Sequence, residues 1–517
     1  MKDNYIKQSP IPTLSTLGGG ANSFSFAGSS GAPAGFVLTL NDTSTPEVVY
    51  DMKVGSDGSI YGCGYTQISG CGDTGLVFKT DASGNIKWQR YLCNNGSFNG
   101  IALDSSDNVI VVARSASGGY GGNIVKYNSS GVLQWQRTLK ETSHYNSFQG
   151  VDVDSSDNIY AAGFVQLTSG NGTYRPLVAK YNSSGALQWH RVYWGYLYGY
   201  QLSFFYGNYD INCYGCKVDS SGNVHITGRI TAQSNSGAYA AKINSSGTWQ
   251  WTTLARHQNQ NPGSGQGFGI DVDSSGNVYI CGNGTSPAQY GNQGTDAMLA
   301  KFDSSGNYQW INFFGNTSSS DEAKGVVVDS SGGIYLSGMY NTGGNANLGL
   351  FIVKFKSSPP GSGNALYGID QQTDWENSLR NFGFYDSSIY MYANTITLDS
   401  DENVYVGGLT NKSTQNWGNT DTEIVLAKVP NDGTLTGTYS FGGSNFIYEA
   451  DGTTEYNINS YYLDTNAPSN YWNPTGNYVG DTNVTFSDNS SSYTMTDAAS
   501  TFTDATTSLT AAITPFE

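Results

Sequence analysis

Two aromatic segments of the sequence carry the side chains best suited to recognising a ligand. One is YWGYLYGYQLSFFYGNYDIN, from Tyr193 to Asn212, and the other runs from Leu366 to Asn394. Tyr and Trp rings can stack on sugar rings, while nearby carboxylates and carboxamides bond hydroxyls. An alternative is that both segments pack on each other or on a neighbouring subunit. The residues predicted to bind a glycan are Trp194, Tyr196, Tyr198, Tyr200, Asp374, Trp375 and Glu376.

Carboxylates in and near these segments bear on catalysis. Glycoside hydrolysis uses two carboxyl groups roughly 5 to 10 Å apart, one of them with a raised pKa. Asp374 and Glu376, together with Asp321 and Glu322, are candidates, but their spacing does not require this chemistry. A sialidase-type site would present an arginine cluster, whereas the arginines here are few and several lie inside a repeated pattern. We therefore expect no catalytic residues and keep a glycosidase as a third alternative.

The cysteines and histidines do not form a metal-binding or redox pattern. Cys213 and Cys216 make a lone CxxC without a second pair or a flanking βαβ pattern, so unpaired thiols are expected. Asp271 begins a segment that looks like a calcium loop, but Gly282 stands where the bidentate Glu belongs. The four histidines fall in separate parts of the chain. We expect no metal and no cofactor.

An internal repeat supplies the elements that position these residues. Its first half reads GVDVDSSDNIYAAG from Gly150, and its second half reads VAKYNSSGALQWHR from Val178. Each half is an alternating strand, a polar turn and another alternating strand, the pattern of a β-hairpin. The first turn recurs seven times between Gly55 and Asp399, about 57 residues apart. We predict an all-β fold, a seven-bladed β-propeller with four-stranded blades, because blades packed around an axis cover one another.

Lysine and tryptophan recur in register with this repeat. Residues that return in every blade serve the fold, so we predict that the lysine pairs with a turn carboxylate and that the tryptophan packs between blades. The lysines are Lys79, Lys126, Lys180, Lys242, Lys301, Lys354 and Lys428, and the tryptophans are Trp88, Trp135, Trp189, Trp251 and Trp310.

The pattern GVxVDSSGNVYxxG followed by xxAKYxSSGxLQWxR resembles the SBBP family of seven-bladed β-propeller repeats of bacterial and phage proteins. The resemblance covers residues 48–442 and departs at Gly55 and in the second hairpins of the last two repeats. It implies the fold, but it implies no activity, because the family has no defined one. The run of three glycines after Leu17 loosely resembles the N-termini of marine phage virion structural proteins.

The overall charge limits the possible partners. The net charge is −17 and the pI is near 4.5, which argues against nucleic-acid binding because such proteins neutralise phosphates with Lys and Arg. The N-terminus has no continuous apolar core of a secretory signal, and no stretch reaches transmembrane length. We therefore expect neither nucleic acid nor membrane insertion.

The chain divides into three parts by composition. Residues 1–47 read as an extended N-terminal arm that could insert into another subunit, and residues 48–442 as the propeller. Residues 443–517 are an acidic, Ser/Thr-rich and β-rich C-terminal extension; from residue 446 they contain nine acids and no Lys or Arg. Its low hydrophobicity predicts that it orders on a partner.

The two faces of the predicted propeller differ. The short DSSGN turns lie on one face, the turn face, and every long variable loop lies on the other, the loop face. We predict a non-enzymatic structural and interaction protein, a phage virion component of the tail, baseplate or fibre apparatus, whose loop face binds a host glycan or a neighbouring subunit. Its partners would be other virion proteins, contacted through both chain ends. The alternative is a bacterial cell-surface or exported adhesin.

Overall fold

All residues whose placement the structure describes are strand, turn or irregular, and none is helical. No helix capable of crossing a membrane is therefore found among them. The computed structural model describes residues 35–41, 46–68, 70–93, 96–114, 121–141, 144–166, 174–197, 210–232, 235–255, 265–285, 295–314, 320–341, 348–355, 379–384, 390–411, 422–431, 437–441, 444–450, 484–488, 495–499, 504–505 and 510–516.

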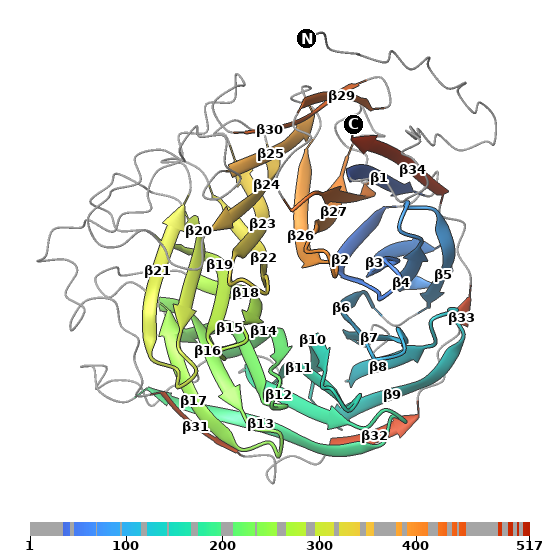
Figure 1. The fold of residues 1–517 in the computed structure, drawn as a ribbon. Helices are drawn as coiled ribbons and strands as arrows, with labels where there is room; N and C mark the ends of the chain where they lie inside the picture. Colours follow the sequence, from blue (N-terminus) through green and yellow to red (C-terminus); the bar gives the residue numbers. More distant parts are fainter. Residues whose placement is uncertain are drawn as a thin grey trace, which may run out of the picture.

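The described strands form blades, which are antiparallel meanders running from the centre of the molecule to its rim (Figure 1). The innermost strands are β2 (Glu47–Val54), β6 (Phe98–Leu103), β10 (Asn146–Val153), β14 (Asp210–Val218), β18 (Gly265–Val272), β22 (Glu322–Val328) and β26 (Met391–Leu398). The second strands are β3 (Ile60–Ile68), β7 (Val109–Arg114), β11 (Ile159–Gln166), β15 (Val224–Ala232), β19 (Val278–Thr285), β23 (Ile334–Asn341) and β27 (Val404–Thr410).

The outer half of each blade is the second hairpin of the repeat. The third strands are β4 (Gly72–Thr80), β8 (Gly121–Tyr127), β12 (Tyr174–Tyr181), β16 (Asn235–Ile243), β20 (Thr295–Phe302), β24 (Leu348–Phe355) and β28 (Glu423–Val429). The fourth strands are β5 (Ile86–Leu92), β9 (Leu133–Glu141), β13 (Leu187–Leu197), β17 (Trp249–Ala255), β21 (Tyr308–Phe314), β25 (Leu379–Phe384) and β1 (Gly35–Asn41).

The innermost strands close a ring. Each contacts the next along the chain, and β26 contacts β2. The blades thus surround a central axis (Figure 1), and the all-β propeller predicted from the repeat is confirmed. Backbone pairing groups the described strands into six sheets, because Ser147 of β10 pairs with Arg114 of β7 and joins two blades. The count of seven blades stays a prediction from the repeat.

The hydrophobic core lies between neighbouring blades. Tyr160 and Val178 of one blade, for example, pack with Ile226 and Leu254 of the next. Side chains of one face of each twisted sheet meet those of the following sheet, and each fully buried Val, Leu or Ile contributes about 1.5–3 kcal/mol. The blades therefore hold one another in place.

The N-terminal arm ends inside the propeller. β1 pairs antiparallel with β28, with Leu38 opposite Leu426, and supplies the fourth strand of the blade that contains β26 to β28. The expected arm of residues 1–47 and propeller of residues 48–442 thus differ from the structure at this boundary. The physical reason is local: the alternating apolar residues Phe36, Leu38 and Leu40 are fully buried in the core against the first blade.

The C-terminal extension pairs with the rim of its own chain. Its strands add to the outer edges of several blades as further antiparallel strands (Figure 1). We expected an extension ordered by a partner, and over these strands the partner is the propeller itself. The pairs are β30 (Ser444–Ala450) with β25 and with β29 (Gly437–Phe441), β31 (Val484–Asp488) with β13, β32 (Met495–Ala499) with β9, β33 (Asp504–Ala505) with β5, and β34 (Thr510–Phe516) with β1.

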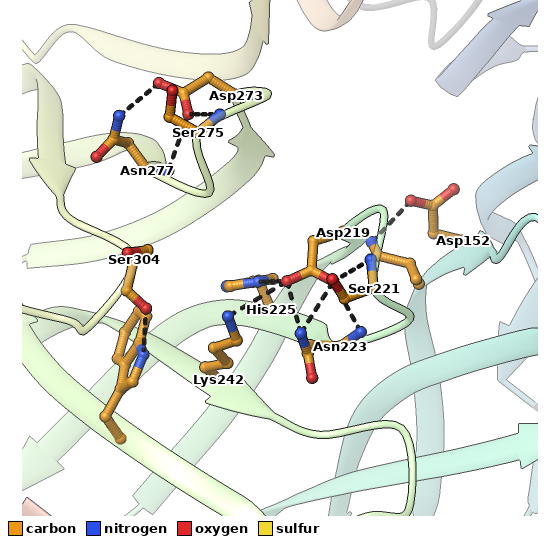
Figure 2. A network of polar contacts seen from close by, with 12 residues as sticks. Asp152, Asp219, Ser221, Asn223, His225, Lys242, Asp273, Ser275, Asn277 and Ser304 are labelled. Carbon is orange, nitrogen blue, oxygen red and sulfur yellow. Dashed lines mark hydrogen bonds and ion pairs between the residues drawn. The ribbon is translucent and has the colours of Figure 1, made fainter.

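The repeated turn carboxylate is the centre of a polar network, which Figure 2 shows at Asp219. Its carboxylate accepts hydrogen bonds from the backbone N–H groups of Ser221 at 3.0 Å and Asn223 at 2.9 Å, and lies 3.3 Å from the Nζ of Lys242. The predicted lysine pairing is confirmed at further turns, including Lys126 with Asp104 at 2.7 Å. These bonds fix the hairpin turns.

The repeated tryptophan also has the predicted place between blades. The indole Nε1 of Trp88 donates to the carbonyl of Ser129 in the next blade at 3.0 Å, and that of Trp189 donates to the carbonyl of Ser245 at 3.1 Å. The indole lies over a turn glycine such as Gly131, where a Cβ would meet the Trp88 ring at 2.6 Å. Trp packing between blades is therefore confirmed.

One pair of cysteines is bonded, at positions for which the sequence predicted neither a bond nor free thiols. Cys71, between β3 and β4 of the first blade, forms a disulfide with Cys93, which directly follows the fourth strand β5. Sequence spacing does not reveal this pair, because the hairpins fold residues 22 positions apart onto each other. Cys213 and Cys216 stay free, as do Cys63 and Cys281.

Candidate functional site

Every innermost strand named above has a β-bulge at the same point of the repeat. In β10, for example, the pairing with β11 shifts register between Phe148 and Gly150. A bulge leaves its extra residue out of the ladder and re-aims that side chain. The opposite strand makes room with glycine, because a Cβ at Gly163 would collide with the carbonyl oxygen of Ser147. The other bulges lie at Val49/Asp51, Phe98/Gly100, Cys213/Gly215, Gly267/Gly269, Ala323/Gly325 and Ala393/Thr395.

The bulges surround a central cavity of about 200 Å³ on the propeller axis. Because each innermost strand runs toward the turn face, the bulge residues lie on the loop-face side of this cavity. The bulge residues that line it are Tyr50, Asn99, Gln149, Tyr214, Phe268, Lys324 and Asn394. Three positions further along the strands, nearer the turn face, the lining residues are Lys53, Asp152, Lys217, Asp271, Val327 and Thr397.

The identities of these lining residues depart from the repeat. Directly after the bulge residue most strands have glycine, as at Gly150, Gly215 and Gly269, because the next blade's backbone lies too close for a side chain. The position before that glycine and the position two residues after it instead vary from blade to blade. A position that serves the fold recurs, whereas a position that serves a single ligand is needed once, so the variable lining marks the cavity as the candidate site.

Charged groups in the cavity link neighbouring blades. Asp152 accepts the backbone N–H of Val218 at 2.9 Å, and Asp271 accepts that of Val328 at 2.8 Å. Lys217 Nζ lies 3.1 Å from Asp271 Oδ1, and this carboxylate raises the pKa of Lys217 above its ordinary value. The lysine therefore stays protonated and can still donate further hydrogen bonds.

Other residues of the cavity lining close the ring between the last and the first innermost strand. Asp51 Oδ2 accepts the N–H of Ile101 at 3.1 Å, and its Oδ1 accepts the hydroxyl of Thr395 at 2.9 Å. The side chain of Asn394 donates to the carbonyl of Val49 at 2.8 Å. The last innermost strand is thus tied to the first by cavity residues.

Aromatic side chains form one wall of the cavity at its loop-face end. The rings of Tyr214 and Phe268 lie 6.1 Å apart with a 36° tilt, and Lys324 Nζ lies 3.7 Å from the centre of the Phe268 ring. Tyr50 is 37% exposed, the most exposed aromatic among the described large hydrophobics. Rings beside lysines, carboxylates and carboxamides can hold a small polar molecule that has both an apolar face and hydroxyls.

Other chemistry has less support among the described residues. No group of three His, Cys, Asp or Glu in the described part of the chain is placed to hold a metal ion. Of the carboxylates considered for glycoside hydrolysis, Glu322 accepts a hydrogen bond from Asn283 Nδ2 at 2.8 Å and pairs with Lys324. Asp321 is buried and its N–H donates to the carbonyl of Thr295.

The glycan residues predicted from sequence fall mostly outside the described residues. Tyr198, Tyr200, Asp374, Trp375 and Glu376 are among those not described. Trp194 and Tyr196, expected in a loop, lie in β13, where their backbone pairs with Ser487 and Thr485 of β31. Tyr193–Leu197, rich in the aromatic residues that favour strands, thus extend this outer strand and pair with β31 along its edge.

The second predicted loop also contains strand. Residues 379–384 form β25, and Met391 to Asn394 belong to the innermost strand β26. Sequence reasoning missed the cavity residues, although a usable pattern was present: the residue before the repeated glycine differs in each copy.

Comparison with known proteins agrees with this architecture. Residues 380–413 match the SBBP β-propeller repeat. No curated protein matches the chain.

Several solved structures resemble the chain in fold. The polysaccharide lyase Uly1 has 9% identity and a TM-score of 0.40, covering 81% of this chain and 94% of its own. Sqt1 from Chaetomium thermophilum bound to the N-terminus of ribosomal protein L10 has 9% identity and a TM-score of 0.37, covering 74% and 97%. The N11 neuraminidase-like protein of A/flat-faced bat/Peru/033/2010 has 10% identity and a TM-score of 0.34, covering 80% and 95%.

Proposed function

We propose that the protein is a non-enzymatic structural and interaction protein, a phage virion component, whose loop face and central cavity bind a sugar unit of a host glycan. The observation that carries the proposal is the cavity lining, which varies from blade to blade inside a repeated frame. Its size, about 200 Å³, suits one monosaccharide unit rather than a large ligand.

The residues available to a sugar support this choice of ligand. Phe268 and Tyr214 offer ring faces, and Lys53 and Lys217 offer donors to hydroxyls. The cavity carboxylates are held by backbone N–H groups of the next blade, as Asp152 is by Val218, which suits fixed acceptors better than groups that exchange protons with a substrate.

Binding of single sugars measured by calorimetry tests the ligand. We expect Phe268→Ala and Tyr50→Ala each to weaken binding about tenfold or more, a change of about 1.4 kcal/mol in binding free energy. Val132→Ala is the matched control, because Val132 is 55% exposed on a second-hairpin turn and does not line the cavity. Equal affinity of Phe268→Ala and wild type for the sugar would show that the cavity is not the binding site. Release of sugar from a glycan by the protein would contradict the proposal that it is not an enzyme.

Mass spectrometry of purified virus particles from the source culture tests the virion role. We expect peptides between Gly100 and Arg137 at an abundance comparable to known structural proteins. Finding the protein on cells or in the medium, and not in particles, would contradict this part and leave the ligand proposal intact.

A second candidate is a bacterial cell-surface or exported adhesin. The observation that favours it is the Cys71–Cys93 disulfide, because such bonds persist in oxidising surroundings outside the cytosol. Cell-surface labelling of the source organism separates this candidate from the virion component.

A further inference from the structure

Three charged residues line one arc of the central cavity. Asp152 lies on β10, Lys217 on β14 and Asp271 on β18, which are consecutive innermost strands, and all three hold the same position of the repeat. In the next two blades this position is uncharged, with Val327 and Thr397. The arc therefore alternates carboxylate, ammonium and carboxylate, with one ammonium group for two carboxylates.

The ammonium group of this arc pairs chiefly with Asp271. Lys217 Nζ lies 3.1 Å from Asp271 Oδ1, and the Asp271 side chain is only 7% exposed. Asp271 has the largest effect in raising the pKa of Lys217, burial opposes it, and Asp152 raises this pKa less. Because one ammonium group cannot neutralise two carboxylates, the arc has an excess of negative charge on the side of Asp152.

The carboxylate of Asp152 is held in a fixed orientation. Its Oδ2 accepts the backbone N–H of Val218 from the next blade at 2.9 Å (Figure 2). A carboxylate offers about four acceptor sites, so this bond leaves Asp152 able to accept hydrogen bonds from a ligand. Since the bond comes from a strand of the ring, the carboxylate is oriented before a ligand arrives.

The other charges that the structure describes at the cavity lie in neutral pairs. Lys53 Nζ is 3.4 Å from Asp51 Oδ1, and Lys324 pairs with Glu322. With the arc included, four carboxylates stand against three ammonium groups among the described residues. The net charge of −17 on the whole chain also attracts cations. The cavity thus favours a ligand with one positive group.

The aromatic wall lies on two of the strands that form this arc. Tyr214 is three residues before Lys217 on β14, and Phe268 is three residues before Asp271 on β18. Both rings line the loop-face end of the cavity, and the charged arc lies nearer the turn face. A sugar whose apolar face contacts these rings can therefore direct a substituent toward the carboxylates.

We propose that the cavity selects an amino sugar, a monosaccharide unit with a free, protonated amine, and that Asp152 accepts hydrogen bonds from this ammonium group. The inference rests on the proposed binding of a sugar unit and names its chemical class. An ammonium group donates three hydrogen bonds and carries a positive charge, whereas a hydroxyl group is neutral. An acidic sugar would bring another negative charge to the arc, which opposes its binding.

Calorimetry with glucosamine, glucose and glucuronic acid tests the class of sugar, at pH 6 so that the amine of glucosamine is protonated. We expect glucosamine to bind about tenfold or more tightly than glucose, and glucuronic acid to bind more weakly than glucose. If glucosamine binds no better than glucose, or if glucuronic acid binds best, this inference is overturned while the sugar site stands. If none of the three binds, the proposed function fails and this inference fails with it.

The variant Asp152→Asn tests where the amine binds. Asparagine keeps an oxygen that can accept the Val218 N–H but removes the charge. We expect the preference for glucosamine over glucose to fall to about twofold or less, with the affinity for glucose unchanged. The matched control is Asp303→Asn, which should keep the preference, because Asp303 accepts the N–H groups of Ser305 and Asn307 in an outer turn. A preference retained in Asp152→Asn, or a loss of glucose binding along with it, would overturn the assignment of the amine to Asp152.

Discussion

The carboxylate of Asp107 accepts hydrogen bonds from the backbone N–H of Ser56 at 3.2 Å and from its hydroxyl at 2.6 Å, across the boundary between two blades. Asp107 has a φ of 55°, in the left-handed region where most repeats place glycine. Asp157 with Ser105 and Glu402 with Ser330 repeat this arrangement. The chain accepts an unfavourable backbone conformation at these turns and gains a link to the preceding blade.

Substitutions at Asp107 separate the two effects. Asp107→Ala keeps the strained φ and loses the link, so we expect a loss of about 1–2 kcal/mol in the free energy of unfolding. Asp107→Gly loses the same link but relieves the strain, so its loss is expected to stay below about 1 kcal/mol. Urea unfolding measures both. An alanine variant no less stable than the glycine variant would show that strain does not matter here.

The buried pair of Lys126 and Asp104 gives a second prediction. The side chains are only 8% and 3% exposed, so Lys126→Met leaves a buried carboxylate without its counterion. We expect a loss of about 3 kcal/mol, measured by urea unfolding. Lys87, 2.8 Å from Asp81 but 52% exposed, is the matched control, and Lys87→Met is expected to cost less than about 1 kcal/mol. Equal costs for the two variants would contradict the role of burial.

His225 gives a prediction about pH. It occupies the strand position where other blades have Tyr160, Tyr279 or Tyr405, and its Nε2 lies 3.1 Å from Asp219 (Figure 2). Burial lowers the pKa of His225 below 6.5, and Lys242 lowers it further, although Asp219 opposes both. As the pH falls, the unfolded chain therefore takes up this proton before the folded protein does. The contribution of His225 to the free energy of unfolding is present above its ordinary pKa and is lost as the pH falls through the pKa that it has in the folded protein.

Replacing this histidine should remove the pH dependence that it adds. We expect the melting temperature of His225→Tyr minus that of the wild type to increase as the pH is lowered from 8 to 5. Tyr279→His, at the same position of another blade, should acquire the opposite trend. If the melting temperatures of all three proteins changed equally between the two pH values, His225 would not be the source of this pH dependence.

The repeat was sufficient to predict the propeller, because hairpin turns and alternating strands are local patterns. The Asp219 network and the Trp88 contact also follow from sequence, since both recur in register. The ends could not be predicted in this way. β1 and β28 are joined only in the folded ring, at opposite ends of the propeller sequence, and no local pattern specifies that pairing.

The candidate site shows the same division. From its aromatic segment, Trp194 was predicted to lie in a loop and bind a glycan, but its backbone pairs with β31 at the rim. The bulge residues Phe268 and Lys324 belong to different repeats and meet only because both innermost strands face the axis. A bulge is a register shift between strands, and a single sequence gives no direct indication of it.

The N-terminal strand provides the last prediction, which concerns closure of the ring. Leu38 is fully buried among Ile60, Leu76 and Leu426, on a segment expected from sequence to reach another subunit. Leu38→Ala should lower the free energy of unfolding by about 2–5 kcal/mol, because the cavity cannot collapse between two packed blades. The exposed Val132→Ala serves as the control with little expected change. Urea unfolding at several protein concentrations measures the effect. If Leu38 acted within its own chain, the loss would not depend on concentration; a loss that diminishes as concentration rises would mean that β1 is exchanged between copies.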